Sequence, residues 1–227
     1  MTVLITAGIL VACLALLTTV GAVLRPPHRL VGRLLLAGWL AVTATVAGSG
    51  RYADELWLGL GLATPLVLGL LALRTAPVRD ALTAGHAVAL LAAAQIPRVV
   101  GGVFLVQLAL DRLPPGFAVP AGVGDVVVGL LAPFVAYAMW RRPRRGIGIA
   151  FNALGLADLV VAIPLGVLHA PGRLQVIVTE PTTELMGELP LALILTFVVP
   201  LAIVLHVASF RLLAAREPAV SGSTPAG

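Results

Sequence analysis

The sequence predicts an all-α fold, a polytopic membrane helix bundle of about seven transmembrane helices. The first reason is composition, because 59% of the residues are apolar and 11% are charged, whereas a soluble domain carries about 25% charged residues. The second is that apolar runs recur along the chain at about the 20-residue length that crosses a bilayer. The third is that basic residues gather in alternate connections between these runs, which is typical of multi-pass membrane proteins.

Each predicted helix is an apolar run that is long enough to span hydrocarbon and poor in charge. The runs cover residues 2–24, 34–50, 56–73, 82–111, 118–140, 147–168 and 190–213. The fourth is longer than a bilayer requires, so its outer end is expected to project from the hydrocarbon. The connection before the seventh is the longest, and we expect it to hold a short strand-like or interfacial piece outside the hydrocarbon or buried in protein. Residues 1–213 therefore form one transmembrane domain, and 214–227 a disordered cytoplasmic tail.

Arginine placement predicts the orientation of the bundle. All 15 basic residues are arginines, and the side that carries more of them is expected to face the cytoplasm. One side carries Arg25, Arg29, Arg33, Arg74, Arg79, Arg141, Arg142, Arg144, Arg145, Arg211 and Arg216. The opposite side carries Arg51, Arg112 and Arg173. The N-terminus is therefore predicted outside and the C-terminus inside, and we expect no nucleic-acid partner for these arginines.

Several chemistries are excluded by residues that the sequence lacks. A retinal Schiff base needs a lysine, and none occurs. The His-Glu-x-x-His and Gly-x-Ser-x-Gly motifs are also missing, so metalloprotease and serine hydrolase chemistry has no support. The single Cys13 excludes an intrachain disulfide or a cysteine metal cluster. The sequence favours a protein that is not an enzyme, with no metal site and no cofactor.

Three charged residues fall inside the predicted helices: Arg98, Asp125 and Asp158. A charged side chain at mid-membrane costs about 2.5–3.5 kcal/mol on insertion scales, so such residues usually face the bundle interior and pair. Helical rise places Arg98 about 20 Å, Asp158 about 15 Å and Asp125 about 10 Å below the outer ends of their helices. The sequence therefore predicts a cluster of Arg98 with one or both aspartates.

Prolines add backbone acceptors at similar depth. Pro97 removes the helical donor of the Ala93 carbonyl and tends to kink the helix. In the same way, Pro133, Pro164 and Pro200 remove the helical donors of the carbonyls of Gly129, Val160 and Thr196, each four residues earlier. Arg98 carries five N–H donors that can satisfy such acceptors. One interpretation is that Arg98 only caps a kinked backbone and an aspartate; the other is an anion or carboxylate site or part of a proton path.

Further polar residues complete the candidate site. Gln95 lies about 60° from Arg98 round the same helix, while Asn152 is six residues from Asp158 and is expected to face a different neighbour. The glycines of 119–129 are interpreted as close helix contacts. The candidate substrate-binding or proton-handling residues are Gln95, Arg98, Asp125, Asn152, Asp158 and His206.

Four segments together resemble a family of small uncharacterised bacterial multi-pass integral membrane proteins. The segments are QIPRVVGGVFL, VPAGVGDVVVGLLAPFVA, FNALGLADLVVAIPLGVL and LPLALILTFVVPLAIVLHVASFRLL, within residues 85–213. The resemblance implies the bacterial cytoplasmic (inner) membrane and the same six candidate positions. It implies no activity.

The leading expectation is a small-solute or proton-linked permease or binding protein that uses an interior Arg–Asp cluster. A second is a non-catalytic membrane subunit or sensor that works through a partner near Arg141 to Arg145. A third is a redox protein that holds haem between His86 and His206. The expected partners are the lipid bilayer, a small-molecule ligand, and a second copy of the chain or another membrane protein.

Overall fold

The computed structural model describes residues 2–25, 28–83 and 85–215, and this part of the chain is helical without a strand. Seven of its helical segments are long and apolar enough to cross a membrane, which confirms the predicted all-α class and the number of candidate spans. The long helices are α1 (Thr2–Val23), α2 (His28–Gly48), α3 (Glu55–Ala72), α7 (Pro115–Arg141), α8 (Arg145–His169) and α9 (Val199–Ala215). The shorter ones are η1 (Arg51–Ala53), α4 (Ala76–Leu82), α5 (Ala87–Ala93), η2 (Ile96–Gly102), α6 (Val103–Ala109), η3 (Glu184–Gly187) and η4 (Ile194–Val198).

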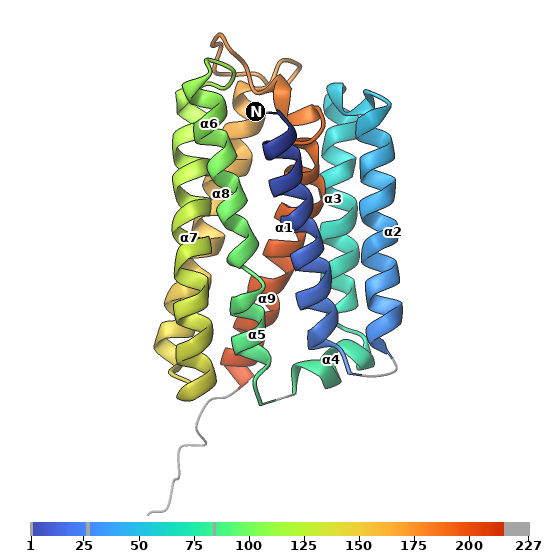
Figure 1. Cartoon of the computed structure of the whole chain (residues 1–227), viewed down its shortest axis with the longest axis vertical. Coiled ribbons are helices and arrows are strands. Elements are labelled where there is room, and N and C mark those ends of the chain that lie inside the picture. Colours follow the sequence, from blue (N-terminus) through green and yellow to red (C-terminus); the bar gives the residue numbers. More distant parts are fainter. Residues whose placement is uncertain (1, 26–27, 84, 216–227) are drawn as a thin grey trace, which may run out of the picture.

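Successive spans run in opposite directions, so the connections gather at two ends of the bundle (Figure 1). The arginine-rich end holds the α1–α2 connection, α4, the α7–α8 connection and the end of α9. The arginine-poor end holds the start of α1, η1, the α6–α7 turn and the long α8–α9 connection. The predicted tail lies, from residue 216 on, outside the described residues.

The fourth span is not the single helix predicted over 82–111. It begins at Ala87, and α5, η2 and α6 build it in sequence, while α4 is a separate short helix at the arginine-rich end. The break follows from Pro97, which has no N–H and whose ring crowds the preceding turn. The backbone forms a 3-10 helix at this point, in which the Arg98 N–H donates to the Gln95 carbonyl at 3.1 Å. This tighter winding sets the direction in which the Arg98 side chain leaves the backbone.

Two glycines of α7 allow it to lie close to this broken span. A Cβ on Gly129 would stand 2.5 Å from the backbone nitrogen of Val99, and one on Gly122 would stand 2.8 Å from Leu105 Cγ. Both distances are below ordinary van der Waals contact, so larger residues would push α7 away from η2 and α6. On its other face α7 packs against α8, and α9 packs against α8, α3 and α5 in the middle of the bundle.

The seventh span opens with a π-helical turn, η4. Its hydrogen bonding includes the Val199 N–H donating to the Ile194 carbonyl five residues back. Pro200 follows directly and leaves the Thr196 carbonyl without its helical donor, as the sequence predicts. Trp39 of α2 supplies the missing donor, because its Nε1 lies 3.0 Å from that carbonyl.

Hydroxyl groups strengthen the same junction. The Thr43 hydroxyl of α2 hydrogen-bonds to the Thr196 hydroxyl and lies 3.0 Å from the Tyr52 hydroxyl. Thr43 and Thr196 are fully buried, and Tyr52 is nearly so. The three side chains join α2, η1 and η4 near the arginine-poor end.

The α8–α9 connection crosses the arginine-poor end and contains η3 where a short strand-like or interfacial piece was expected. It is attached to α3 by the Arg173 N–H, which donates to Glu55 Oε2 at 2.9 Å. It is attached to α8 by the Thr183 hydroxyl, which donates to the Gly166 carbonyl at 2.7 Å. The connection therefore lies over the space between α3 and α8.

Candidate functional site

Arg98 is the centre of a buried ion cluster. Its side chain is 2% exposed and leaves η2 toward α7 and α8. Its Nε donates to Asp125 Oδ1 at 2.7 Å, and its Nη2 forms an ion pair with Asp158 Oδ2. Its Nη1 donates to the Gly155 carbonyl at 3.2 Å. One guanidinium thus joins two carboxylates and a backbone acceptor from two neighbouring helices.

The carbonyl that Arg98 binds differs from those expected. The sequence pointed to carbonyls freed by prolines, which in α8 would be that of Val160 beneath Pro164. Arg98 instead binds Gly155, whose missing side chain exposes its backbone to the guanidinium. A Cβ there would lie 3.3 Å from Arg98 Nη1. Access, more than a lost helical hydrogen bond, therefore selects the acceptor.

A chain of polar side chains continues from Arg98 toward the arginine-rich end. The Asn152 amide nitrogen donates to the Gly148 carbonyl at 2.7 Å and to the Ser209 hydroxyl at 2.8 Å. Its oxygen lies 2.8 Å from His206 Nδ1, so with this amide orientation Nδ1 carries the imidazole hydrogen. The free electron pair of His206 Nε2 then faces Arg98 Nη1, 3.5 Å away. Neutral His206 is thereby an acceptor from the arginine.

Each side chain packed around Arg98 faces a glycine of a neighbouring element. Asp125 faces Gly101, Asp158 faces Gly124 and His206 faces Gly155. A Cβ at any of the three glycines would overlap the side chain that it faces. These glycines create the room in which the polar groups approach Arg98. We define Arg98, Asp125, Asp158 and His206 as the arginine cluster.

Gln95 lies outside the arginine cluster. Its side chain is 1% exposed, and its Nε2 donates to the Ala202 carbonyl of α9 at 3.3 Å. Its Oε1 is buried and accepts no hydrogen bond from the described residues. The structure thus joins five of the six candidates through direct contacts and leaves Gln95 at a separate contact with α9. Asn152 and Asp158 do have different immediate neighbours, as expected, but His206 and Arg98 link them.

The arginine cluster carries more negative than positive charge. Two carboxylates share one guanidinium, so with both aspartates ionised and His206 neutral the formal charge is −1. Asp125 Oδ1 is bound to Arg98, while Asp125 Oδ2 accepts no hydrogen bond from any described residue. One carboxylate oxygen, which lies against Gly101, therefore has no hydrogen-bond donor among the described residues.

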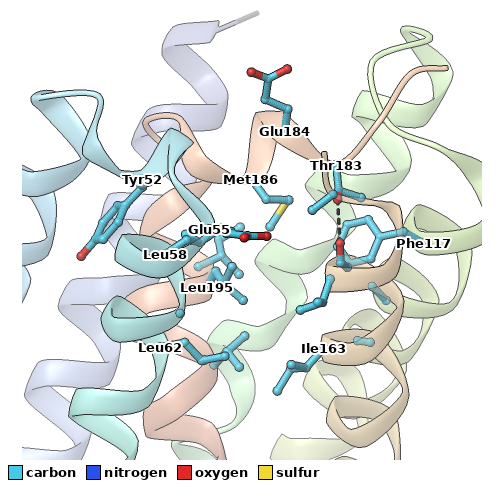
Figure 2. A pocket seen from close by; sticks show the side chains of 18 of the residues that line it. Tyr52, Glu55, Leu58, Leu62, Phe117, Ile163, Thr183, Glu184, Met186 and Leu195 are labelled. Atoms are coloured by element: carbon cyan, nitrogen blue, oxygen red, sulfur yellow. Dashed lines mark hydrogen bonds between the residues drawn. The ribbon is translucent and has the colours of Figure 1, made fainter. Parts of the chain in front are cut away.

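Asp125 also lines a cavity of about 180 Å³, which we call the Asp125 cavity (Figure 2). Aliphatic and aromatic side chains from α3, α7, α8 and η4 form most of its wall, and Figure 2 shows Leu58, Leu62, Phe117 and Ile163 around it. Residues of the α8–α9 connection, Met186 among them, line the end of the cavity nearer the arginine-poor end, which we call its mouth. Asp125 belongs to the lining, whereas Arg98, Asp158 and His206 do not.

Few polar side chains face the Asp125 cavity near its mouth. Figure 2 shows the Glu55 carboxylate directed into the space and the Glu184 carboxylate directed away from it. The Glu55 side chain is 34% exposed, and Arg173 Nε lies 3.8 Å from its Oε1. The Thr183 hydroxyl is already bound to a backbone carbonyl. The cavity is therefore apolar in its middle and carries carboxylates at its mouth and its floor.

Toward the arginine-rich end the bundle is closely packed below the polar chain. Val88, Ala89, Met139 and Leu213 form one apolar cluster there, and each is at most 3% exposed. A Cβ on Gly148, the acceptor of Asn152, would lie 2.9 Å from Leu213 Cδ1. The polar chain thus ends against packed side chains.

The two histidines considered for haem do not face a common space. His206 is fully buried, with Nδ1 against Asn152 and Nε2 against Arg98. His86 begins α5, and its ring stacks on Trp140 with 3.8 Å between ring centroids. Haem ligation requires a free ring nitrogen from each histidine. These residues do not fit that group.

Sequence reasoning missed Gly155 and Ser209, which complete the site, and Trp39, which donates to the Thr196 carbonyl at the start of the seventh span. Ser209 lies three residues after His206, which places both on one face of a helix, and this spacing was a usable signal. Gly155 and Trp39 act through backbone contacts between helices distant in sequence. No local pattern identifies those contacts.

Fold and site together define a helix bundle with seven segments long and apolar enough to cross a membrane, and with a buried ion cluster. The chain belongs to a family described as a domain of unknown function, DUF8737, whose model matches residues 55–214. No curated protein and no solved structure matches the chain. The family match contains α3 to α9 and hence the whole arginine cluster, and it starts earlier than the segments that suggested a resemblance.

Proposed function

We propose that this chain is a membrane-embedded binding protein for a small organic cation that enters the Asp125 cavity. In this proposal the arginine-rich end faces the cytoplasm of a bacterium and the cavity opens on the outer side of the inner membrane. The main support for this proposal is that the arginine cluster has one carboxylate more than it has guanidinium groups. The ligand, or a proton in its absence, supplies the positive charge that the cluster lacks.

The apolar side chains around the arginine cluster form a region of low dielectric constant. An unbalanced charge among buried apolar side chains is costly, and a counter-charge at hydrogen-bond distance offsets that cost. Asp125 Oδ2 is the acceptor without a donor, and it belongs to the carboxylate that lines the cavity. An ammonium group supplies both a donor and the missing charge. Glu55 near the mouth favours the same sign of ligand.

The size of the cavity sets the size of the ligand. A dry cavity of about 150 Å³ holds one benzene molecule, and the Asp125 cavity measures about 180 Å³. Its walls are mostly aliphatic and aromatic. A single apolar ring or a short branched chain that carries one amine matches both the volume and the wall.

The packing below the cluster favours binding over transport. A permease needs a route to the other side of the membrane, and the side chains of Val88, Met139 and Leu213 fill the region between the polar chain and the arginine-rich end. Arg98 is itself held by two ion pairs. We therefore propose the binding role and do not extend it to transport.

The test uses the full chain purified in mild detergent, with benzylamine, benzyl alcohol and benzoate as probes. Benzylamine is expected to raise the melting temperature most, and benzoate not at all. At 100 times its Kd a ligand stabilises by about 2.7 kcal/mol, which is roughly 5–10 °C for a chain of this size. Asp125→Asn is expected to remove the effect of benzylamine while the protein stays folded, because Arg98 keeps Asp158. Equal shifts from all three probes would refute the proposal.

A cavity-filling variant separates binding in the Asp125 cavity from binding elsewhere. Gly59 lines the cavity, and a Cβ there meets no atom within 4 Å, so Gly59→Leu adds side-chain volume at the cavity wall with room for its Cβ. Gly38 of α2 has the same open surroundings away from the cavity, and Gly38→Leu is the matched control. Benzylamine is expected to stabilise the control and not Gly59→Leu.

A second candidate role, work through a protein partner, has one supporting observation. A hollow of about 480 Å³ at the arginine-rich end is lined by Trp140 and by Arg141, Arg142 and Arg144. Such a surface suits an acidic segment of another protein. Stable co-purification of a partner that Arg142→Glu abolishes would favour this role, and a monomeric protein that binds benzylamine alone would favour the first.

A further inference from the structure

A second and larger apolar space lies on the other side of the bundle, and we call it the α2–α3 groove. It measures about 610 Å³, within the range of about 300–1,000 Å³ that is usual for ligand sites. Val31, Leu35 and Trp39 of α2 form one wall, Leu68 of α3 another, and Phe197 and Leu201 the back. α2 stands at the edge of the bundle, so the groove lies at its periphery (Figure 1).

The arginine-rich end of the groove is strongly basic. His28 and Thr75 line the groove there. The neighbouring residues 23–33 and 73–83 contain Arg25, Arg29, Arg33, Arg74 and Arg79 against the single acid Asp80. Arg29 Nε lies 3.2 Å from the carbonyl of Leu24, which is itself a lining residue. Arg33 Nε is buried and donates to no described residue. These five arginines therefore have no carboxylate partner in the part of the chain that the structure describes.

The length of the groove matches one leaflet of a bilayer. On α2 the lining runs from His28 to Val42, and 14 residue steps of a helix rise about 21 Å. Half of a bilayer, headgroups included, is about 20–22 Å thick. The groove is apolar over most of this length and basic at one end, which is also the polarity of one leaflet.

We propose that the α2–α3 groove binds one anionic phospholipid from the leaflet at the arginine-rich end. An acyl chain lies between α2 and α3, and the phosphate lies among Arg25, Arg29 and Arg74. Charge selects this occupant over a transmembrane helix of another protein or of a second copy, because an apolar helix would leave the arginines without a counter-charge. The proposal is independent of the Asp125 cavity.

Native mass spectrometry of the full chain in mild detergent tests the proposal. Phosphatidylglycerol and phosphatidylcholine with the same acyl chains are added in turn, and phosphatidylglycerol is expected to bind at least ten times more tightly. Arg29→Gln and Arg74→Gln are each expected to weaken it about five-fold, equivalent to about 1 kcal/mol per arginine near an anionic headgroup. Arg142→Gln, at the same end but away from the groove, is the control and is expected to change nothing.

A steric variant tests the acyl chain separately. Leu68 lines the groove and Leu130 lies on the surface of α7, and both are 56% exposed. Leu68→Trp is expected to reduce the binding of phosphatidylglycerol, and Leu130→Trp to leave it unchanged. Equal binding of the two lipids, displacement by inorganic phosphate, or a delipidated protein that dimerises with this groove covered would overturn the proposal.

Discussion

Replacement of Arg98 by methionine isolates the energetic role of the arginine cluster. Methionine keeps an unbranched apolar side chain but removes the guanidinium, and Asp125 and Asp158 then face each other without a counter-charge. Removal of one partner from a buried ion pair costs about 3–5 kcal/mol. Arg98 is the partner of two carboxylates and also binds the Gly155 carbonyl, so the upper part of that range applies.

Thermal melting in detergent measures this cost. A change of 1 kcal/mol moves the melting temperature by about 2–4 °C for a chain of 150–250 residues, so Arg98→Met is expected to melt roughly 10–20 °C below the wild type. The triple variant Arg98→Met, Asp125→Asn, Asp158→Asn carries no buried charge and is expected to recover most of this loss. Exposed Arg112→Met is the control. A melting temperature of Arg98→Met within about 2 °C of the wild type, or a triple variant no more stable than the single one, would refute the reasoning.

Three further variants address contacts around the cluster, each measured by the same melting assay. Gly155→Ala is expected to cost about 1–3 kcal/mol, because the new methyl group overlaps the His206 ring. Trp39→Phe leaves the Thr196 carbonyl without a donor and is expected to cost about 1–3 kcal/mol. Ser209→Ala removes one of the two acceptors of the Asn152 amide nitrogen and is expected to cost about 0.6 kcal/mol.

For each of these three variants, a specific result would contradict the expectation. Gly146 lies on the same helix as Gly155, and a Cβ there meets nothing within 4 Å. Equal melting temperatures for Gly146→Ala and Gly155→Ala would show that His206 gives way easily. Wild-type stability of Trp39→Phe would mean that the π turn needs no donor from α2. A large loss in Ser209→Ala would mean that the serine hydroxyl holds Asn152 and His206 in place.

Much of the fold follows from the sequence, because the solvent of a membrane protein imposes a simple rule on each span. Apolar runs of the required length give the helices and their number. Boundaries are less visible: the predicted fourth run begins at residue 82, whereas in the structure Leu82 ends α4 and the span begins at Ala87. Pro97 marks the break at η2 in the sequence, but the partners of Arg98 lie 27 and 60 residues further along the chain.

The central part of the site follows from energetic cost. Arg98, Asp125 and Asp158 are the residues that a membrane interior tolerates only when they are paired, so their pairing can be expected without knowing the packing. The roles of Gly155 and Trp39 depend on which helices lie side by side. Gln95 is a residue for which the sequence suggests too much. Its position near Arg98 suggests a shared site, but in the structure its side chain binds α9.

The π turn at the start of the seventh span contributes side chains both to the Asp125 cavity and to the α2–α3 groove. A π turn adds one residue to an α-helical course, which offsets the side chains on its two sides by about 100°. Ile194, Leu195 and Val199 line the Asp125 cavity, while Phe197 and Leu201 line the α2–α3 groove. One short stretch of backbone is the partition between the two spaces. Deletion of a single residue from it would rotate one set of side chains away while His206 stayed in the cluster, so the count of residues in this turn, as much as their chemistry, keeps the two spaces separate.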